Sequence, residues 1–376
     1  MPFQKMTIDD IPVIAPYFRF VTTNTCDFTV GGMFMWRDYF HMAWQVKDGV
    51  LYSTLTGEDG NLYYNLPLGE DIPAGLRQCL TRHPERPVRF CTIPEAELPL
   101  FRALPGRVEI TEEENFADYL YSAEEMIRLS GKKFSGQRNH IHKFRKLYPD
   151  AEYVPLTAAD EPLLERFWQD YGAEFSKESA IAKNELRLAK EMLRHLAGDW
   201  FMAGGLLHEG RLVAISMGEQ CGSTMQVHIE KALYSYPGAY PTMVQEFARH
   251  CDDSVRWMNR EDDARDKGLR MSKMQYLPAA LGGKLCFEVG SELDRLHEIP
   301  TLHSDRLTLD ALTEKDKLPY NALCLDEERN RLWGYDWHKD YDGSPMEEYF
   351  LSVAREDFRL RRCVNFAVRL GEDFIG

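Results

Sequence analysis

The residues best suited to acid–base chemistry lie in residues 225–232, where apolar and polar side chains alternate. Such alternation predicts a β-strand with Gln226, His228 and Glu230 on one face. A positioned carboxylate can accept a proton in the transition state of a group transfer. We therefore predict that Glu230 is a catalytic base and that His228 orients it. A solvated strand face is the structural alternative.

The segment after this strand predicts an anion-binding pocket. Gly238 lies in a loop, and Pro241 fits the first position of the helix that follows. Free backbone N–H groups gather at a helix N-terminus and bind negative charge there. Tyr240, at this junction, is predicted to belong to the catalytic group. The backbone N–H groups of residues 225–240 are predicted to stabilise an oxyanion.

Polar residues at the end of a second strand are the expected substrate-binding group. Residues 255–259 are predicted to form this strand, and residues 268–276 a helix. Open α/β sheets place ligands at strand ends. Arg260 is expected to lie beside Glu230, and a solvated loop and helix is the alternative. The predicted substrate-binding residues of this group are Asn259, Arg260, Lys273 and Tyr276.

A basic segment, residues 131–148, contrasts with a chain whose net charge is −15. Residues 132–146 contain six Lys or Arg and no acidic residue. This asymmetry predicts a phosphate-bearing partner, such as tRNA, an anionic lipid headgroup or a nucleotide tail. Lys132, Lys133 and Arg138 are the residues predicted to steer it. A helix face packed against an acidic neighbour is the alternative.

The whole chain has the composition of a folded protein with two or three domains in its 376 residues. Its negative charge argues against a general nucleic-acid binder. The eight Cys form no CxxC pair and have no zinc-ligand spacing, so we predict reduced thiols, no metal site and a cytoplasmic location. Neither a signal peptide nor an apolar run long enough to span a membrane is evident.

An antiparallel meander occurs twice and begins a third time. Turns with Gly separate the predicted strands in residues 42–66 and again in residues 202–232. The third copy starts at residue 365 and reaches only its first hairpin. This pattern predicts an internal structural repeat. The third unit is expected to be partial, from a longer product or completed by another element. Its open sheet edge would be a site of self-association.

Several short motifs together resemble one bacterial family, built on the C-terminal domain of phosphatidylglycerol lysyltransferase. The likeness covers about residues 1–290. A second, shorter likeness starts at Arg306 and is similar to the opening of acetyltransferases of the ribosomal-protein N-terminal type. The motifs of the main likeness are Asp118-Tyr119-Leu120-Tyr121, Leu129-Ser130-Gly131-Lys132-Lys133, Val227-His228-Ile229-Glu230-Lys231-Ala232, Asn259-Arg260-Glu261-Asp262 and Gly268-Leu269-Arg270.

The resemblance implies an α/β fold of mixed sheets. It would contain two tandem GNAT-like acyl-CoA N-acyltransferase domains and a partial third. The domains expected on this basis are residues 1–115, residues 116–290 with the basic segment, a linker at residues 291–303, and residues 304–376. The implied activity is an acyl- or aminoacyltransferase acting on an amine or hydroxyl acceptor. Its donor would be aminoacyl-tRNA or acyl-CoA, with no further cofactor.

Two departures from the resemblance keep alternatives open. Acetyl-CoA-dependent members of the fold carry a glycine-rich pyrophosphate loop after the fourth strand. Residues 234–240 hold one Gly and no Arg or Gln there. The transmembrane part of the full lysyltransferase has no counterpart in the sequence. The alternatives are a non-catalytic module that binds a nucleotide or anionic metabolite, and an N-acetyltransferase that acts through a completed C-terminal domain.

Overall fold

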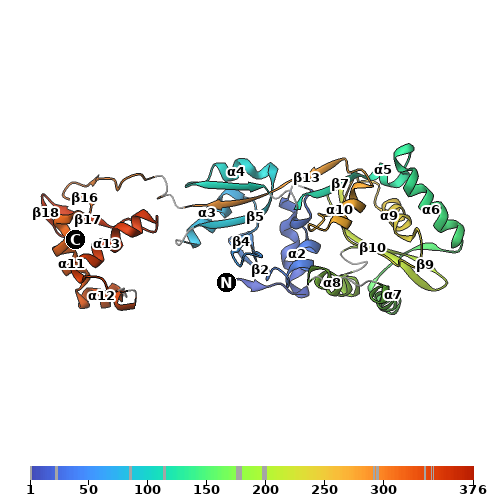
Figure 1. Ribbon diagram of the computed structural model, residues 1–376, viewed down its shortest axis with the longest axis horizontal. Coiled ribbons are helices and arrows are strands. Elements are labelled where there is room, and N and C mark those ends of the chain that lie inside the picture. Colours follow the sequence, from blue (N-terminus) through green and yellow to red (C-terminus); the bar gives the residue numbers. More distant parts are fainter. Residues whose placement is uncertain are drawn as a thin grey trace. The chain divides into compact units, whose positions relative to one another are not determined.

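The computed structural model describes the chain except residues 1, 22–23, 84–86, 113–115, 175–179, 197–200, 291–292, 294–295, 334–335, 340 and 342. The chain forms two compact units (Figure 1). The first contains Met1–Leu76, Arg89–Phe101 and Ile110–Phe287. The second contains Arg77–Val88, Arg102–Glu109 and Glu288–Gly376.

A seven-stranded sheet is built mainly from the N-terminal third of the chain. Its order is β1-β2-β3-β4-β5-β14-β6. Turns at Gly49 and Gly60, both with positive φ, connect its hairpin strands, as the alternation in residues 42–66 predicts. The strands are β1 Gln4–Lys5, β2 Ala43–Lys47, β3 Val50–Thr56, β4 Leu62–Tyr64, β5 Val88–Pro94, β14 Lys284–Val289 and β6 Val108–Glu112.

A second seven-stranded sheet carries the predicted site. Its order is β13-β7-β12-β11-β10-β9-β8. The strand expected at residues 255–259 begins only at Trp257, because a turn bonds the Val255 N–H to the Asp252 carbonyl. The strands are β13 Ala280–Gly282, β7 Asp118–Ser122, β12 Trp257–Asn259, β11 Thr224–Ala232, β10 Arg211–Cys221, β9 Met202–His208 and β8 Glu152–Pro155.

The two sheets share one arrangement of strands. From β1 and from β8, each has three antiparallel pairings and then one parallel pairing, β4 with β5 and β11 with β12. A helix joins the two parallel strands in each case, α3 in the first sheet and α9 in the second. The common strand order is the one that an internal repeat requires. In addition, β14, which follows the second meander in the chain, pairs within the first sheet.

Helices cover the second sheet and build its core. Helix α9 packs on β10 and β11 and against α5 and α6 (Figure 1). Its apolar side chains, including Met243 and Phe247, form one cluster with Met225 and Val227 of β11. Up to residue 290, the helices of at least four described residues are α1 Ile11–Ile14, α2 Val30–Trp36, α3 Ile72–Arg82, α4 Leu98–Arg102, α5 Ala123–Arg128, α6 Ser135–Leu147, α7 Glu161–Glu174, α8 Ala180–Leu196, α9 Ala239–His250 and α10 Lys267–Met274.

The second unit contains a small antiparallel sheet of order β15-β16-β17-β18. Both edge strands are two residues long. Strand β16 starts at Thr308, because Ser304 and Leu307 form a turn just before it. The elements are β15 Leu302–His303, β16 Thr308–Ala311, β17 Phe366–Leu370, β18 Asp373–Phe374, α11 Lys317–Cys324, α12 Glu327–Trp333 and α13 Met346–Arg359.

Candidate functional site

A β-bulge at His228 divides the polar row predicted on β11. Met217 of β10 pairs with Ile229 and Gly218 with Val227, so His228 has no partner across the strand pair. Val227 packs in the core against α9, and Glu230 also contacts α9. In a regular strand, residues three apart would face opposite sides of the sheet. A bulge disrupts strict alternation and re-aims side chains. The expectation that Gln226, His228 and Glu230 form one row is therefore wrong.

Glu230, Tyr240 and Arg260 form a hydrogen-bonded cluster, which places three of the predicted site residues together. The Arg260 guanidinium donates to a Glu230 carboxylate oxygen. It also donates to the Tyr240 hydroxyl at 2.6 Å, and that hydroxyl donates to the same Glu230 oxygen at 2.8 Å. Burial raises the pKa of Tyr240 well above its usual range, so its hydroxyl stays protonated and can donate.

Aromatic rings surround the Arg260 guanidinium. Its central carbon lies 4.7 Å from the ring centre of Tyr276 and 5.5 Å from that of Tyr121. The side chain is 3% exposed, yet its Nε and Nη1 have no hydrogen-bond partner among the described residues. A buried guanidinium with unsatisfied donors is costly, because it loses hydration without replacement. Carboxylates and phosphates have the geometry that would satisfy these donors.

Lys273 holds the backbone of the loop that carries Arg260. Its ammonium donates to the carbonyl oxygens of Arg260, Glu261 and Asp262. Burial lowers the pKa of Lys273. Lys273 therefore binds backbone carbonyl oxygens, whereas the sequence predicts that it binds substrate. The loop needs this support because Glu261, Ala264 and Arg265 all have positive φ, which costs non-glycine residues free energy.

His228 belongs to a different cluster from Glu230. Its Nε2 lies 2.8 Å from Glu219 and its Nδ1 lies 2.7 Å from Glu261. Burial lowers the pKa of His228, but the hydrogen bonds with both carboxylates outweigh it and raise that pKa to about 9. The side chain is therefore a buried imidazolium, held between two acids. The prediction that His228 orients Glu230 is wrong, since its ring nitrogens are both engaged elsewhere.

Asn259 is also engaged by the protein. Its amide nitrogen donates to Asp118 at 2.8 Å, and its oxygen accepts from the backbone N–H of Glu261 at 2.7 Å. The carboxylate of Asp118 lies 2.7 Å from the Lys284 ammonium. Asn259 thus fixes the start of the Arg260 loop, and the structure places no open donor of Asn259 beside Glu230.

A buried acidic group surrounds Lys284. Asp27 lies 2.5 Å from the ammonium, and Cys26 Sγ lies 3.5 Å from it. Cys26, Asp27 and Asp118 are close enough to share a metal ion. The Lys284 ammonium already lies among these oxygens and supplies the positive charge there. Burial nonetheless raises the pKa of Asp27 to about 6.

The predicted anion pocket at the start of α9 is filled by the protein itself. The helix begins at Ala239 rather than at Pro241, and Gly238 lies so close to the His140 carbonyl that an added Cβ would be 2.3 Å from that oxygen. The backbone N–H groups of Tyr234 and Ser235 both donate to the Glu174 carboxylate, at 2.6 and 3.3 Å. The loop before α9 therefore binds a carboxylate side chain of the same protein.

The basic segment forms a 3-10 turn, Lys132–Phe134, and helix α6. Arg138 donates to the carbonyl oxygens of Leu129 and Gly131, the latter at 2.7 Å, so it caps the end of α5. Lys133 pairs with Glu125. Lys132 is exposed at the surface. Of the three predicted steering residues, Arg138 and Lys133 therefore also have a structural role.

Sequence reasoning missed Tyr121, Glu219 and Glu261 as neighbours of the site. Gly218, an isolated glycine inside a predicted strand, was the available signal, because such glycines often mark a bulge. An added Cβ there would lie 2.3 Å from the Gln226 carbonyl. The pairing of Glu219 with His228 follows from that bulge and could not be found by alternation alone.

The sheets define a mixed α/β fold, which this chain shares with the solved C-terminal domain of a putative lysylphosphatidylglycerol synthetase and with L-PGS. The chain belongs to the family of phosphatidylglycerol lysyltransferase C-terminal domains, whose model matches residues 18–286. Among the described residues, no helix is long and apolar enough to cross a membrane.

Three individual proteins are similar to this chain in sequence or fold. A conserved protein of unknown function from Bacteroides thetaiotaomicron is 29% identical, with a TM-score of 0.69 over 77% of this chain and 99% of that one. L-PGS from Bacillus licheniformis is 11% identical, with a TM-score of 0.56 over 76% and 93%. An uncharacterised protein of Mycoplasmoides gallisepticum is 25% identical over 46% of this chain, which spans 55% of that relative's length.

Proposed function

We propose that this protein transfers an aminoacyl group from aminoacyl-tRNA to an amine or hydroxyl acceptor. The buried Arg260, with two unpartnered donor nitrogens next to Glu230 and Tyr240, is the observation that carries the proposal. A site prepared for an anionic substrate group, beside a carboxylate that can accept a proton, suits this class of reaction. The basic segment supports a polyanionic donor.

In the proposed reaction, an anionic group of a substrate binds Arg260 through its open donors. Arg260 then shares its charge between that group and Glu230, and closure of the site removes water from the carboxylate. Both changes raise the proton affinity of Glu230. Glu230 accepts the proton of the acceptor amine or hydroxyl as its nitrogen or oxygen attacks the ester carbonyl.

Collapse of the tetrahedral intermediate breaks the bond to the ribose oxygen of tRNA. Glu230 returns its proton to that leaving oxygen, so protons balance over the cycle. Once Glu230 is protonated, the Tyr240 hydroxyl, kept neutral by burial, turns its O–H from Glu230 to the developing oxyanion. His228, Asn259 and Lys273 position the loop and strand and do not touch the reacting atoms in this scheme.

A non-catalytic anion-binding module is the second candidate. Glu174 supports it, because its carboxylate occupies the backbone N–H groups of the β11–α9 loop. In CoA-dependent acetyltransferases this loop binds pyrophosphate, so an acyl-CoA donor is disfavoured. A module of this kind would bind anions at Arg260 without turnover.

The deciding experiment uses the full chain with tRNA charged with radiolabelled amino acids. Acceptors of three kinds are supplied: an amine, a sugar hydroxyl and a glycerol-based phospholipid. Transfer of label to one acceptor, absent without protein, supports the transferase. Binding of charged tRNA without loss of its ester over hours would favour the binding module. Transfer from acyl-CoA alone would overturn the choice of donor.

A further inference from the structure

Three side chains that can bind a metal ion lie together at the outer edge of the second sheet. Asp150, His208 and Glu209 each offer one ligand atom, and these atoms all lie within 4.8 Å of one another. Asp150 precedes β8, the edge strand, and His208 ends β9. Glu152 of β8 pairs with Leu207 of β9, so the antiparallel register brings residues together that are distant in the chain. Spacing along the sequence, on which the prediction of no metal site rests, does not reveal this group.

The hairpin turn and two aromatic rings fix the positions of His208 and Glu209. The two turn residues, Glu209 and Gly210, both have positive φ, as a tight two-residue connection between β9 and β10 requires. The imidazole ring of His208 lies 5.0 Å from the ring of Tyr148 and 5.9 Å from that of Tyr236, measured between ring centres. These contacts hold the imidazole in place, so it loses little conformational entropy when it binds a ligand.

The Nδ1 atom of His208 lacks a satisfied partner. It is buried from solvent and has no hydrogen-bond partner among the described residues. An Asp150 carboxylate oxygen lies 3.0 Å from Nδ1, but the two atoms are not aligned for a hydrogen bond. Two ligand atoms bound at about 2.1 Å to one zinc ion lie roughly 3.0–3.4 Å apart, so this approach is the one that two ligands of a common ion make. With its proton on Nε2, the imidazole offers the Nδ1 lone pair to a metal.

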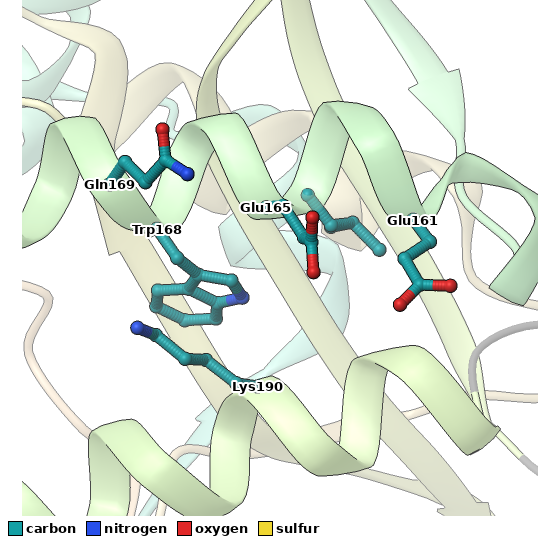
Figure 2. A pocket seen from close by; sticks show the side chains of 6 residues that line it. Glu161, Glu165, Trp168, Gln169 and Lys190 are labelled. Atoms are coloured by element: carbon teal, nitrogen blue, oxygen red, sulfur yellow. The ribbon is translucent and has the colours of Figure 1, made fainter.

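The carboxylates of this group have no Lys or Arg partner in the described part of the chain. With a neutral imidazole, the group therefore carries two negative charges that a divalent cation would balance. The acidic group around Lys284, by contrast, already contains a cation. In the pocket of about 290 Å³ between α7 and α8, which Figure 2 shows, Glu161 and Glu165 already interact with other residues of the chain. Of these three places, the edge of the second sheet is the one prepared for an added cation.

We propose that Asp150, His208 and Glu209 together bind one divalent transition-metal ion, and that Zn²⁺ suits this ligand set best. An imidazole nitrogen favours Zn²⁺, Cu²⁺ or Ni²⁺ over Mg²⁺ and Ca²⁺, and carboxylate oxygens are common zinc ligands. Asp150 and Glu209 are exposed, so small rotamer changes bring their oxygens to bonding distance. Three protein ligands leave the fourth position of a tetrahedral ion to water or an external ligand. The site includes no residue of the Arg260 cluster and does not depend on the transferase reaction.

Calorimetric titration of the full chain with zinc chloride, in a buffer that does not bind metals, tests the proposal. We expect saturable binding of Zn²⁺, and binding of Mg²⁺ that is weaker by about tenfold or more, because Mg²⁺ prefers oxygen ligands. Equal affinity for the two ions would show a patch of carboxylates without a nitrogen ligand and would overturn the proposal. Absence of Zn²⁺ binding at micromolar concentration would overturn it as well.

Variants then locate the bound ion. Asp150→Ala removes a charged ligand at an exposed position, and we expect it to weaken Zn²⁺ binding by about tenfold or more. His208→Gln should weaken it similarly, and thermal unfolding without metal shows whether the lost ring packing has altered the fold. His142→Gln, at an exposed histidine of α6, is the control and should bind Zn²⁺ as the unchanged protein does. Unaltered affinity in Asp150→Ala, or in a folded His208→Gln, would refute the assignment.

Discussion

Arg260 gives one guanidinium nitrogen to Glu230 and leaves two others without a hydrogen-bond partner in the described part of the chain. The ion pair is nearly fully buried. Burial of an arginine stabilises a protein only when its donors are satisfied. The ion pair therefore leaves two buried donor nitrogens of Arg260 unsatisfied. This is the physical basis for proposing that an anionic group of a substrate binds Arg260.

Replacing Glu230 by Gln should abolish the proposed base while keeping the shape of the side chain. We expect transfer to fall about 10²- to 10⁴-fold, the usual contribution of general base catalysis. The measurement is single-turnover transfer of label from charged tRNA. Glu152→Gln, an exposed carboxylate on β8, is the control. Full activity of the Glu230 variant would show that another group accepts the proton.

His228 should make stability depend on pH in a defined window. Its folded pKa of about 9 lies above its ordinary value of 6.5, so the stabilisation is complete below about pH 6.5 and is lost as pH rises toward 9. The shift corresponds to roughly 3 kcal/mol. Urea unfolding measured from pH 6 to 10 should show this loss, and His228→Gln should flatten it. An equal slope in the variant would assign the dependence to other groups.

Gly31 should tolerate no side chain. A Cβ at this position would lie 2.4 Å from His228 Nε2 and 2.9 Å from Glu219. Its N–H also donates to Glu219 at 2.6 Å. Gly31→Ala should destabilise the protein by about 1–3 kcal/mol through overpacking. Gly172→Ala, in α7 with open space around it, should instead be neutral or stabilise by about 0.5–1 kcal/mol. Thermal unfolding of the Gly31→Ala and Gly172→Ala variants, each compared with the unchanged protein, measures the two effects.

Lys284 should be essential for stability because it neutralises buried carboxylates. Lys284→Met leaves Asp118, which is fully buried, without its cation, and should cost about 3–5 kcal/mol. Adding Asp118→Asn should recover part of the loss in a double-mutant cycle. Lys315→Gln, at an exposed position, is the control. Additive effects of the two changes would show that they do not act as a pair.

The basic segment should bind polyanions, and the affinity should fall as the salt concentration rises. Changing Lys132, Lys133 and Arg138 to Glu should weaken tRNA binding, and wild-type affinity should fall as salt rises. Because Arg138 caps α5, its change also disturbs the fold. A variant of Lys132, Lys143 and Lys146, which carry exposed charges on or beside α6, separates the two effects. Binding that is independent of salt would leave the segment a structural helix.

The sequence by itself determined the two meanders and the family. The alternation in residues 202–232 and the turns at Gly210 and Gly222 predict the hairpins of the second sheet to within a few residues. These features depend on neighbours in the chain, so local patterns are enough to predict them. The contact between Glu230 and Arg260 could also be predicted, because the family resemblance implies that their two strands are neighbours in the sheet.

Only the tertiary structure decided which polar residues face one another. A single extra residue in β11, His228, separates its own side chain from that of Glu230. Residues distant in the chain, such as Glu261 and Glu219, then engage His228. Side chains expected to bind substrate, Asn259 and Lys273, hold the loop instead. Periodicity cannot reveal such pairings, because one residue of bulge reverses which side chains share a face.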